Sequence, residues 1–278
     1  MMLRPALAAL LTLALAACTV AAPAERRANA DRIAAAGALA PLTLQTAEFD
    51  LHARLKAGCA SDTLVVYIEG DGFAWKRIGE RSDDPTPLNP LALRLAAMDK
   101  APSVAWLARP CQFTGGEAAR GCNGNLWTGA RYSEAVIAAS NDAIDMLKRK
   151  SGADRVALVG YSGGGVVAAL AAMRRTDVIW LKTVASPLDT TAFTTHHKVT
   201  RLAGSLNPAD HAERLASLPQ THYAGARDDV VPPAINRSFL ARMRETRCIT
   251  LEELPGANHH DGWETAWADI GAKTPACT

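Results

Sequence analysis

The segment RVALVGYSGGG at residues 155–165 constrains the fold more than any other part of the sequence. An apolar run of β-prone residues ends in a serine set among glycines, and the next residues, VVAALAAMRR, have a helical pattern. A strand that passes into a helix through so short a turn needs glycines, because a Cβ would not fit where the two elements approach. The segment therefore predicts a buried strand, a sharp turn at Ser162 and a helix that starts near Gly163.

The rest of the chain, from about residue 42, also alternates strand-like and helix-like segments. Residues 133–152 form the clearest helix, with Ser133 as its N-cap and Gly152 after its last turn. A hairpin is expected over residues 42–56, and strand-like runs occur in TLVVYIEGDG, APSVAWLARP, VIWLKTVASP and THYAGARDD. Strands that alternate with helices indicate a mostly parallel sheet with helices on both faces. We expect one α/β domain over residues 42–278.

Chemically active residues follow several of these strands. In such sheets, ligands bind at the carboxyl ends of the strands. The strand near Val65 is followed by EGDG, Val159 by Ser162, Tyr223 by Asp228 and Asp229, and the last strand by His259 and His260. The sequence therefore brings a serine, an acid and a histidine, in that chain order, to one edge of one sheet.

These motifs resemble those of the α/β-hydrolase superfamily, and the resemblance extends from about residue 42 to the end. GYSGG matches the G-x-S-x-G nucleophile elbow, and GARDDVVP and GANHHDGW match the stretches that carry the acid and the histidine. The resemblance implies an eight-stranded, mostly parallel sheet with helices on both faces and a small lid-like insertion. It assigns a catalytic Ser162, Asp228 and His259, with Asp229 and His260 as alternatives. More narrowly, YIEGDG and ARPCQF resemble segments of uncharacterised proteobacterial envelope lipoproteins of this superfamily.

The resemblance also implies an oxyanion hole made of two backbone N–H groups. Gly163 is expected to supply one, and Asp71 or Gly70 the other. Many family members carry His-Gly where this chain has Glu69-Gly70. Two ionised carboxylates, at Glu69 and Asp71, would oppose the stabilisation of negative charge. We therefore expect them to turn away from the site or to hydrogen-bond the loop.

The first residues, MMLRPALAALLTLALAAC, have the pattern of an export signal. The LAAC box resembles that of a bacterial lipoprotein, in which the residue matching Cys18 is lipidated; an ordinary secretory signal is the alternative. We expect a lipoprotein signal peptide at residues 1–17 and an Ala-rich tether outside the core at residues 18–41. Thr19 in place of aspartate favours the outer membrane, by resemblance to Gram-negative sorting. The expected location is the bacterial cell envelope, lipid-anchored on the periplasmic side.

Export changes the interpretation of the six cysteines, because an oxidising envelope allows disulfides. Cys111 and Cys122 bracket a short Gly-rich loop and are the best candidate pair. Cys248 with Cys277 is the second candidate, and buried reduced thiols are the alternative. No Cys-x-x-Cys or His-rich spacing suggests zinc, and no motif indicates an organic cofactor, so no metal and no cofactor are expected.

Several other residues invite functional interpretations but favour structural ones. His196 and His197 precede Asp228, contrary to the family order, His222 lies inside a strand, and residues 82–90 have the composition of a loop before a helix. Residues 187–219 occupy the usual place of a lid, which would favour lipid-like substrates. The aromatic residues near the predicted site are candidates for the pocket wall, although core packing is the alternative for each: Phe73, Trp75, Trp127 and Trp263.

The formal net charge of +2 gives no indication of nucleic-acid binding. The motifs favour a serine hydrolase that cleaves carboxylic esters or thioesters through an acyl-enzyme, with a small-molecule or lipid-like ester as substrate and the membrane reached through the lipid anchor. A peptidase or an acyltransferase would use the same chemistry. A non-catalytic lipoprotein that binds a ligand on a hydrolase scaffold is the alternative from another class. The sequence carries no signal for an oligomeric state.

Overall fold

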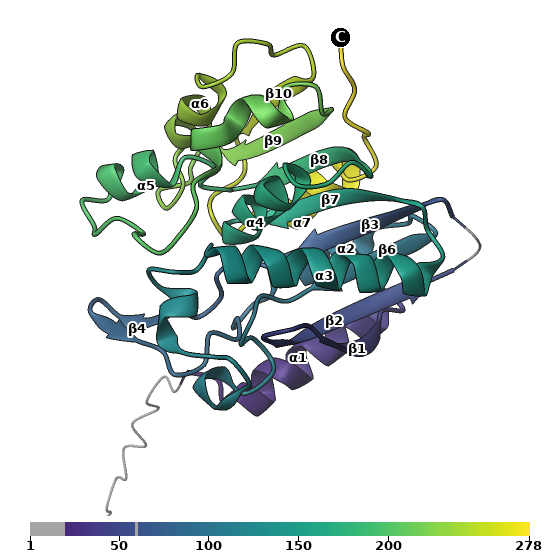
Figure 1. Ribbon diagram of the computed structural model, residues 1–278, viewed down its shortest axis with the longest axis vertical. Coiled ribbons are helices and arrows are strands. Elements are labelled where there is room, and N and C mark those ends of the chain that lie inside the picture. Colours follow the sequence, from purple (N-terminus) through teal and green to yellow (C-terminus); the bar gives the residue numbers. More distant parts are fainter. Residues whose placement is uncertain (1–19, 59–60) are drawn as a thin grey trace, which may run out of the picture.

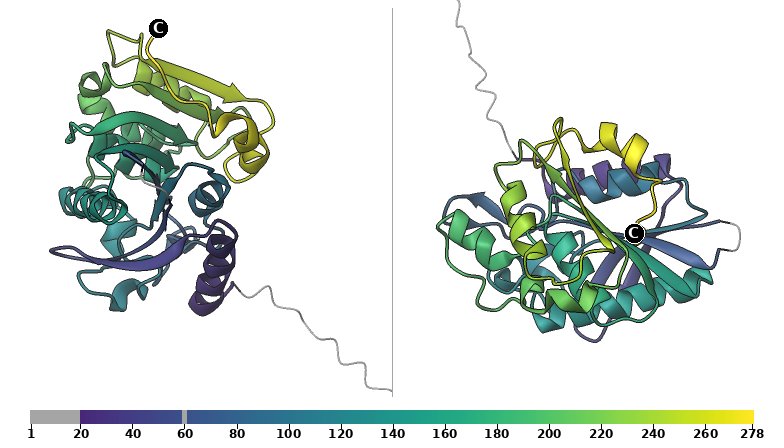
Figure 2. Two further views of the ribbon diagram at one scale, coloured as in Figure 1. Left: turned by 90° about the vertical axis from the view of Figure 1, so that its right-hand side faces the viewer. Right: turned by 90° about the horizontal axis from the view of Figure 1, so that it is seen from above.

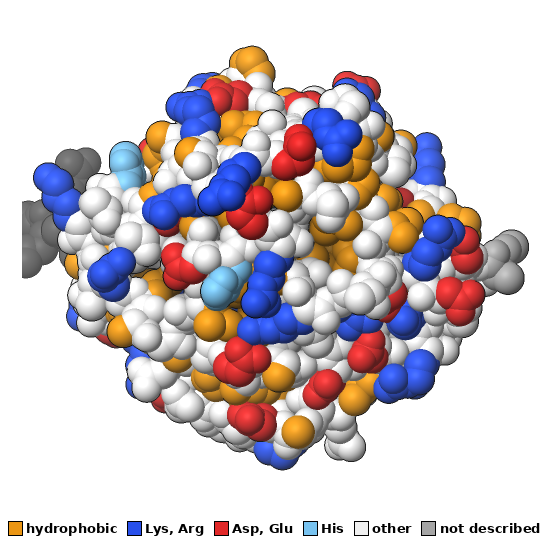
Figure 3. Space-filling view, turned by 45° about the horizontal axis from the view of Figure 1, so that its top comes forward, with side chains coloured by type: hydrophobic (Ala, Val, Ile, Leu, Met, Phe, Trp, Pro, Cys, Tyr) orange, Lys and Arg blue, Asp and Glu red, His pale blue; other side chains and the backbone are white. Residues whose placement is uncertain are grey.

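The computed structural model describes residues 20–58 and 61–278. The predicted signal peptide at residues 1–17, the lipidation site Cys18 and the unassigned Cys59 lie outside the described residues. The described part contains no helix that is long and apolar enough to cross a membrane. Side chains of both charges are interspersed with apolar ones on the face drawn in Figure 3, consistent with the near-neutral composition.

The core of the molecule is an eight-stranded sheet in the order β1-β2-β6-β3-β7-β8-β9-β10 (Figure 1). Its strands are β1 (Ala40–Gln45), β2 (Asp50–Ala57), β3 (Thr63–Ile68), β6 (Ser103–Leu107), β7 (Arg155–Tyr161), β8 (Val178–Val184), β9 (Gln220–Gly225) and β10 (Ile249–Leu254). The first two strands form the expected hairpin, β2 also runs antiparallel to β6, and the remaining neighbours are parallel. The predicted mostly parallel, eight-stranded sheet is thus confirmed.

Helices cover both faces of this sheet (Figure 2). One face carries α3 (Glu134–Ser151), α4 (Gly163–Ala172), α6 (Pro233–Leu240) and the 3-10 segment η3 (Pro208–Leu215), and the other carries α1 (Pro23–Ala36), α2 (Leu91–Met98) and α7 (Trp263–Ile270). Strand β3 shows why both faces are filled. Leu64, Val66 and Ile68 pack into one apolar cluster, while Val65 and Tyr67 pack into the other, because successive side chains point to opposite faces.

The remaining elements lie at the carboxyl edge of the sheet or in its loops. They are the small hairpin of β4 (Trp75–Arg77) and β5 (Glu80–Arg81), the helix α5 (Thr190–His196) and two 3-10 turns, η1 (Gly116–Ala118) and η2 (Gly124–Trp127). Both candidate cysteine pairs form disulfides, Cys111–Cys122 with a Cα–Cα distance of 5.8 Å, and Cys248–Cys277.

The expected tether at residues 18–41 needs correction, because most of it belongs to the folded domain. Residues 23–36 form the helix α1, which packs beside α2 and buries Ala30 and Ala34 completely. A Cβ on Gly37 would lie 2.5 Å from the Cα of Ala97, so the two segments approach closely. An Ala-rich composition resembles a linker in sequence, but alanine has the highest helix propensity and its small side chain allows such close packing.

Candidate active site

Ser162 occupies a strained turn between β7 and α4. Its φ of 50° and ψ of −124° lie in a region that residues with a Cβ rarely adopt, and its N–H donates to the carbonyl of Val184 at 2.8 Å. The flanking glycines are required by close contacts. A Cβ on Gly160 would lie 2.3 Å from the Cα of Gly165, and one on Gly164 would lie 2.2 Å from the carbonyl oxygen of Ile68. The turn therefore exposes the hydroxyl above the sheet edge, as the motif predicts.

The structure brings Ser162, His259 and Asp228 into one hydrogen-bonded line. His259 Nε2 lies 3.2 Å from Ser162 Oγ, and His259 Nδ1 lies 2.9 Å from Asp228 Oδ2. The other carboxylate oxygen of Asp228 accepts the N–H groups of Val230 and Val231 at 2.9 and 2.7 Å. Because the Asp228 side chain is buried and held at both oxygens, it can hold the imidazole in one orientation.

The two alternative residues lie outside this line. Asp229 is exposed, and among the described residues it makes no hydrogen bond or ion pair with His259. His260 is also exposed, and its Nδ1 lies 3.3 Å from the hydroxyl of Tyr161 rather than near Ser162.

Two of the three expected oxyanion donors have free N–H groups. Within residues 20–58 and 61–278, the N–H groups of Gly163 and Asp71 donate to no protein acceptor. The N–H of Gly70, in contrast, donates to Glu69 Oε1 at 3.0 Å. Gly70 is therefore excluded as a donor in this arrangement, because an N–H that is already bonded to a buried carboxylate is not available to a second anion.

The Glu69 carboxylate hydrogen-bonds the loop, which is one of the two expected arrangements. Besides the N–H of Gly70, its carboxylate accepts Trp106 Nε1 at 3.0 Å and the N–H of Leu93, in the first turn of α2, at 3.3 Å. Burial raises the pKa of Glu69, while these donors act in the opposite direction. The carboxyl group thus fastens the loop after β3 to the start of α2.

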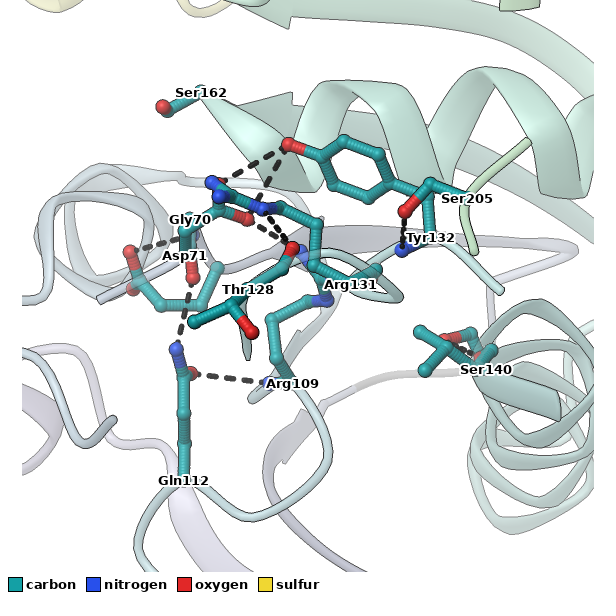
Figure 4. Close-up of polar contacts among 12 residues, drawn as sticks. Gly70, Asp71, Arg109, Gln112, Thr128, Arg131, Tyr132, Ser140, Ser162 and Ser205 are labelled. Atoms are coloured by element: carbon teal, nitrogen blue, oxygen red, sulfur yellow. Dashed lines mark hydrogen bonds and ion pairs between the residues drawn. The ribbon is translucent and has the colours of Figure 1, made fainter. Parts of the chain in front are cut away.

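Asp71 lies against the elbow, and a Cβ on Gly163 would be 2.0 Å from its Oδ1. Its carboxylate is held by Arg131 Nη1 at 2.6 Å, Arg109 Nη1 at 3.1 Å and the hydroxyl of Tyr132 at 3.1 Å (Figure 4). Burial raises the pKa of Asp71, but the two guanidinium groups outweigh it and leave the pKa below its ordinary value. Because two guanidinium groups surround one carboxylate, the group formed by Asp71, Arg109 and Arg131 has a net positive charge.

A glutamine anchors the same loop from below. Gln112 Nε2 donates to the carbonyl of Gly70 at 2.9 Å, and Gln112 Oε1 accepts the N–H of Arg109 at 3.1 Å (Figure 4). Gln112 follows Cys111, so the disulfide-closed loop holds the oxyanion loop. No role for Arg109, Gln112, Arg131 or Tyr132 is predicted from the sequence. The ARPCQF segment contains Arg109 and Gln112, but nothing in it identifies the loop of Gly70 and Asp71 as its partner.

A cavity of about 510 Å³ opens beside Ser162. It is lined by apolar side chains from the loops after β3 and β8, by polar side chains near the elbow and by both site histidines: Glu69, Asp71, Phe73, Ala74, Trp75, Pro87, Leu88, Asn89, Leu91, Arg94, Arg131, Tyr132, Tyr161, Pro187, Phe193, Val230, Val231, His259 and His260. Phe73 and Trp75 are therefore wall residues. Trp127 and Trp263 are buried elsewhere, with their indole N–H groups bonded to Ser82 and Asn258 carbonyls.

The other candidates have structural positions. His222 is buried between Thr183 Oγ1 at 2.8 Å and Gln220 Oε1 at 3.0 Å, and His197 Nε2 lies 2.7 Å from the carbonyl of Val230. Residues 82–90 form the expected loop before α2, although Pro87, Leu88 and Asn89 also line the cavity. The expected lid at residues 187–219 covers the cavity only at its start, because η3 packs into the core.

Comparison with known proteins identifies the fold. No family model and no curated protein matches the chain. Among solved structures, an esterase of Pyrococcus furiosus is 14% identical, covers 84% of this chain and 88% of its own, and has a TM-score of 0.58. Est1E of Butyrivibrio proteoclasticus is 15% identical, covers 83% of this chain and 95% of its own, and has a TM-score of 0.57. A Xanthomonas campestris α/β serine hydrolase without a lid is 14% identical, covers 86% of this chain and 97% of its own, and has a TM-score of 0.53. The chain therefore has the α/β-hydrolase fold.

Proposed function

We propose that the protein is a serine hydrolase that cleaves carboxylic esters or thioesters through an acyl-enzyme. The observation that carries the proposal is the line from Ser162 Oγ to His259 Nε2 and from His259 Nδ1 to Asp228, at 3.2 and 2.9 Å, beside a cavity of about 510 Å³. The esterases named above share the fold, which supports an ester as the substrate class.

The first half-reaction follows from this geometry. Neutral His259 takes the proton of the Ser162 hydroxyl as the oxygen attacks the substrate carbonyl, and it later gives that proton to the leaving alcohol or thiol. Asp228 accepts the Nδ1–H of the ring and stabilises the imidazolium that forms. Water then attacks the acyl-Ser162 ester with His259 again as the base, which releases the acid and restores the serine.

The negative charge that develops on the carbonyl oxygen needs donors aimed at it. The free N–H groups of Gly163 and Asp71 supply two, and each such donor is worth about 2.7–4 kcal/mol of barrier in enzymes where it has been removed. Arg109 and Arg131 neutralise the Asp71 side chain, so the carboxylate does not cancel this stabilisation. The apolar side of the cavity suits an acyl or alcohol group of modest size.

The proposal includes a location. Cys18, after the apolar run of the signal, would carry the lipid that anchors the protein to the envelope membrane on its periplasmic side, with the outer membrane favoured. The two disulfides support an oxidising compartment.

A fluorophosphonate probe tests the proposed activity, because it reacts only with a serine that its surroundings have activated. We expect a covalent label on Ser162, found by peptide mass mapping, and no label in Ser162→Ala. Asp228→Asn should slow labelling by up to about 10⁴-fold, the size of the effect in known triads. Its neighbour Asp229→Asn, exposed and apart from His259, should label like the wild type. A folded protein that takes up no label would favour a non-catalytic scaffold.

A further inference from the structure

The first described residues lie beside the mouth of the active-site cavity. Arg26, in the first turn of α1, is buried and donates to two backbone carbonyls: its Nε to that of Ala21 at 2.7 Å and its Nη1 to that of Thr86 at 3.0 Å. The same guanidinium stacks over Phe73, a wall residue of the cavity, at 4.8 Å. Because Thr86 precedes the wall residue Pro87, the chain enters the folded domain next to the cavity.

This entry point limits where an anchor at Cys18 can be. Cys18 precedes Val20 by two residues, and two residues of chain span at most about 7 Å. A lipid attached there would bring the bilayer surface to the cavity side of the molecule and not to the opposite edge of the sheet.

Exposed apolar side chains gather on the same side. The described residues include six large, exposed hydrophobic side chains, and five of them surround the chain entry and the cavity: Val20, Trp75, Ile78, Leu88 and Val199. Trp75 and Leu88 line the cavity, Val20 is at the chain entry, and Val199 follows α5, whose Phe193 is a wall residue. Ile78, at the tip of the β4–β5 hairpin, is fully exposed. Hairpin and α5 project from the same side of the molecule in Figure 1.

Charges on the hairpin are largely compensated. Lys76 pairs with Asp83 at 2.7 Å, and Arg77 pairs with Glu80 at 2.7 Å. The tip therefore presents a tryptophan and an isoleucine with little free charge around them, a composition suited to the boundary between headgroups and acyl chains. An apolar protein surface beside a lipid anchor adds a second point of attachment to the membrane.

We propose that Val20, Trp75, Ile78, Leu88 and Val199, which we call the mouth face, rest on the lipid bilayer that carries the anchor. The cavity then opens at the membrane surface, and its substrates are esters of membrane lipids or of amphiphiles dissolved in the bilayer. The substrate class rests on the proposed hydrolase function, whereas the docking geometry does not.

The docking geometry is tested on the full chain, reconstituted in vesicles of phosphatidylethanolamine and phosphatidylglycerol. An environment-sensitive fluorophore is attached at Ile78→Cys in a Cys59→Ser background, and vesicle lipids carry a nitroxide near the headgroup. Met98→Cys is the matched control, since Met98 is also exposed but ends α2 a few residues before β6 begins, at the opposite edge of the sheet. We expect quenching of about twofold or more at position 78 and almost none at position 98.

Equal quenching at the two positions, or none at position 78, would overturn the proposal. A fluorophore at position 78 that is shielded from water but not quenched by lipid would also overturn it, because a protein would then occupy the mouth face.

A kinetic comparison tests the substrate class. Ile78→Glu should lower hydrolysis of an ester embedded in vesicles by roughly tenfold and leave a short water-soluble ester unaffected, since Ile78 does not line the cavity. Met98→Glu should change neither rate. Equal loss on both esters would contradict the substrate class. Absence of activity on every ester, with quenching at position 78 retained, would refute the hydrolase function while the docking geometry stands.

Discussion

At the scale of single residues, Asp71 has two opposing effects at the candidate site. Its N–H is free for the proposed oxyanion, and its carboxylate lies against Gly163. Arg109 and Arg131 hold that carboxylate and supply more positive charge than it carries. In the proposed mechanism, these two arginines keep the Asp71 carboxylate from opposing the negative charge that develops on the substrate oxygen.

Removing one of these arginines should abolish the net positive charge of the group around Asp71. Arg131→Gln is expected to lower kcat by about 10- to 100-fold on a soluble ester with a smaller change in KM, because the remaining pair of Asp71 and Arg109 is neutral and no longer favours the oxyanion in the transition state. Adding Asp71→Asn to that variant should restore part of the loss, since Arg109 then again gives the group a net positive charge. Steady-state kinetics of the two single variants and the double variant measure the coupling, with thermal unfolding as the check on folding. Purely additive losses would argue against charge compensation.

At the scale of elements, small residues allow close packing at two places in the fold. The Ala-rich residues 23–36 form α1, whose small side chains allow close contact with α2, and the glycines of the elbow allow β7 and α4 to approach each other. Strand β9 shows the opposite case, a polar residue in a fully buried strand. His222 is accommodated there because Thr183 on β8 and Gln220 on β9 satisfy both ring nitrogens.

This buried imidazole should make the stability of the sheet depend on pH. Burial lowers the pKa of His222 from 6.5 to about 3. The folded state thus binds its proton more weakly than the unfolded state, and the contribution to stability is present above pH 6.5 and is lost as pH falls toward 3. Between pH 7 and pH 5 the loss amounts to about 2 kcal/mol.

Urea unfolding of the wild type and of His222→Gln at both pH values measures this contribution. The fall in unfolding free energy from pH 7 to pH 5 should be smaller by about 2 kcal/mol in the variant, whatever its absolute stability. An identical fall in the two proteins would show that His222 does not titrate with folding.

At the scale of the whole molecule, the proposed anchor and the cavity lie on the same side of the protein. The chain enters the domain beside the cavity, and the Cys111–Cys122 loop carries Gln112 to the loop of Gly70 and Asp71, next to Arg109, which precedes that loop. The proposed location and the proposed chemistry are therefore linked through the same side of the protein.

The anchor itself is tested by metabolic labelling with a clickable fatty acid in a bacterial host. The wild type should take up the label on an N-terminal peptide that begins at residue 18, because the lipid is attached to the first mature residue. Cys18→Ser should take up none, and Cys59→Ser should label normally. Label that persists in Cys18→Ser would place the lipid on another residue or refute the anchor.

Much of this protein is determined by local sequence. Alternating apolar segments with capped helices specify the parallel sheet, and the glycines around Ser162 specify the turn, because both depend on neighbouring residues and on backbone sterics. The carboxyl-edge positions of Ser162, Asp228 and His259 follow from the same pattern, because each comes directly after a strand.

Only the tertiary structure decided which of the neighbouring candidates meet. Asp228 rather than Asp229 faces His259, because a turn that directs one side chain into the site directs the next one to solvent. The local sequence also gives no indication of three further contacts: that of α1 with α2, that of the Gly70 N–H with Glu69, and those of the two arginines with Asp71. They join residues that are distant in sequence or depend on the direction of one side chain, and no local pattern encodes a contact between segments that meet only after the sheet has formed.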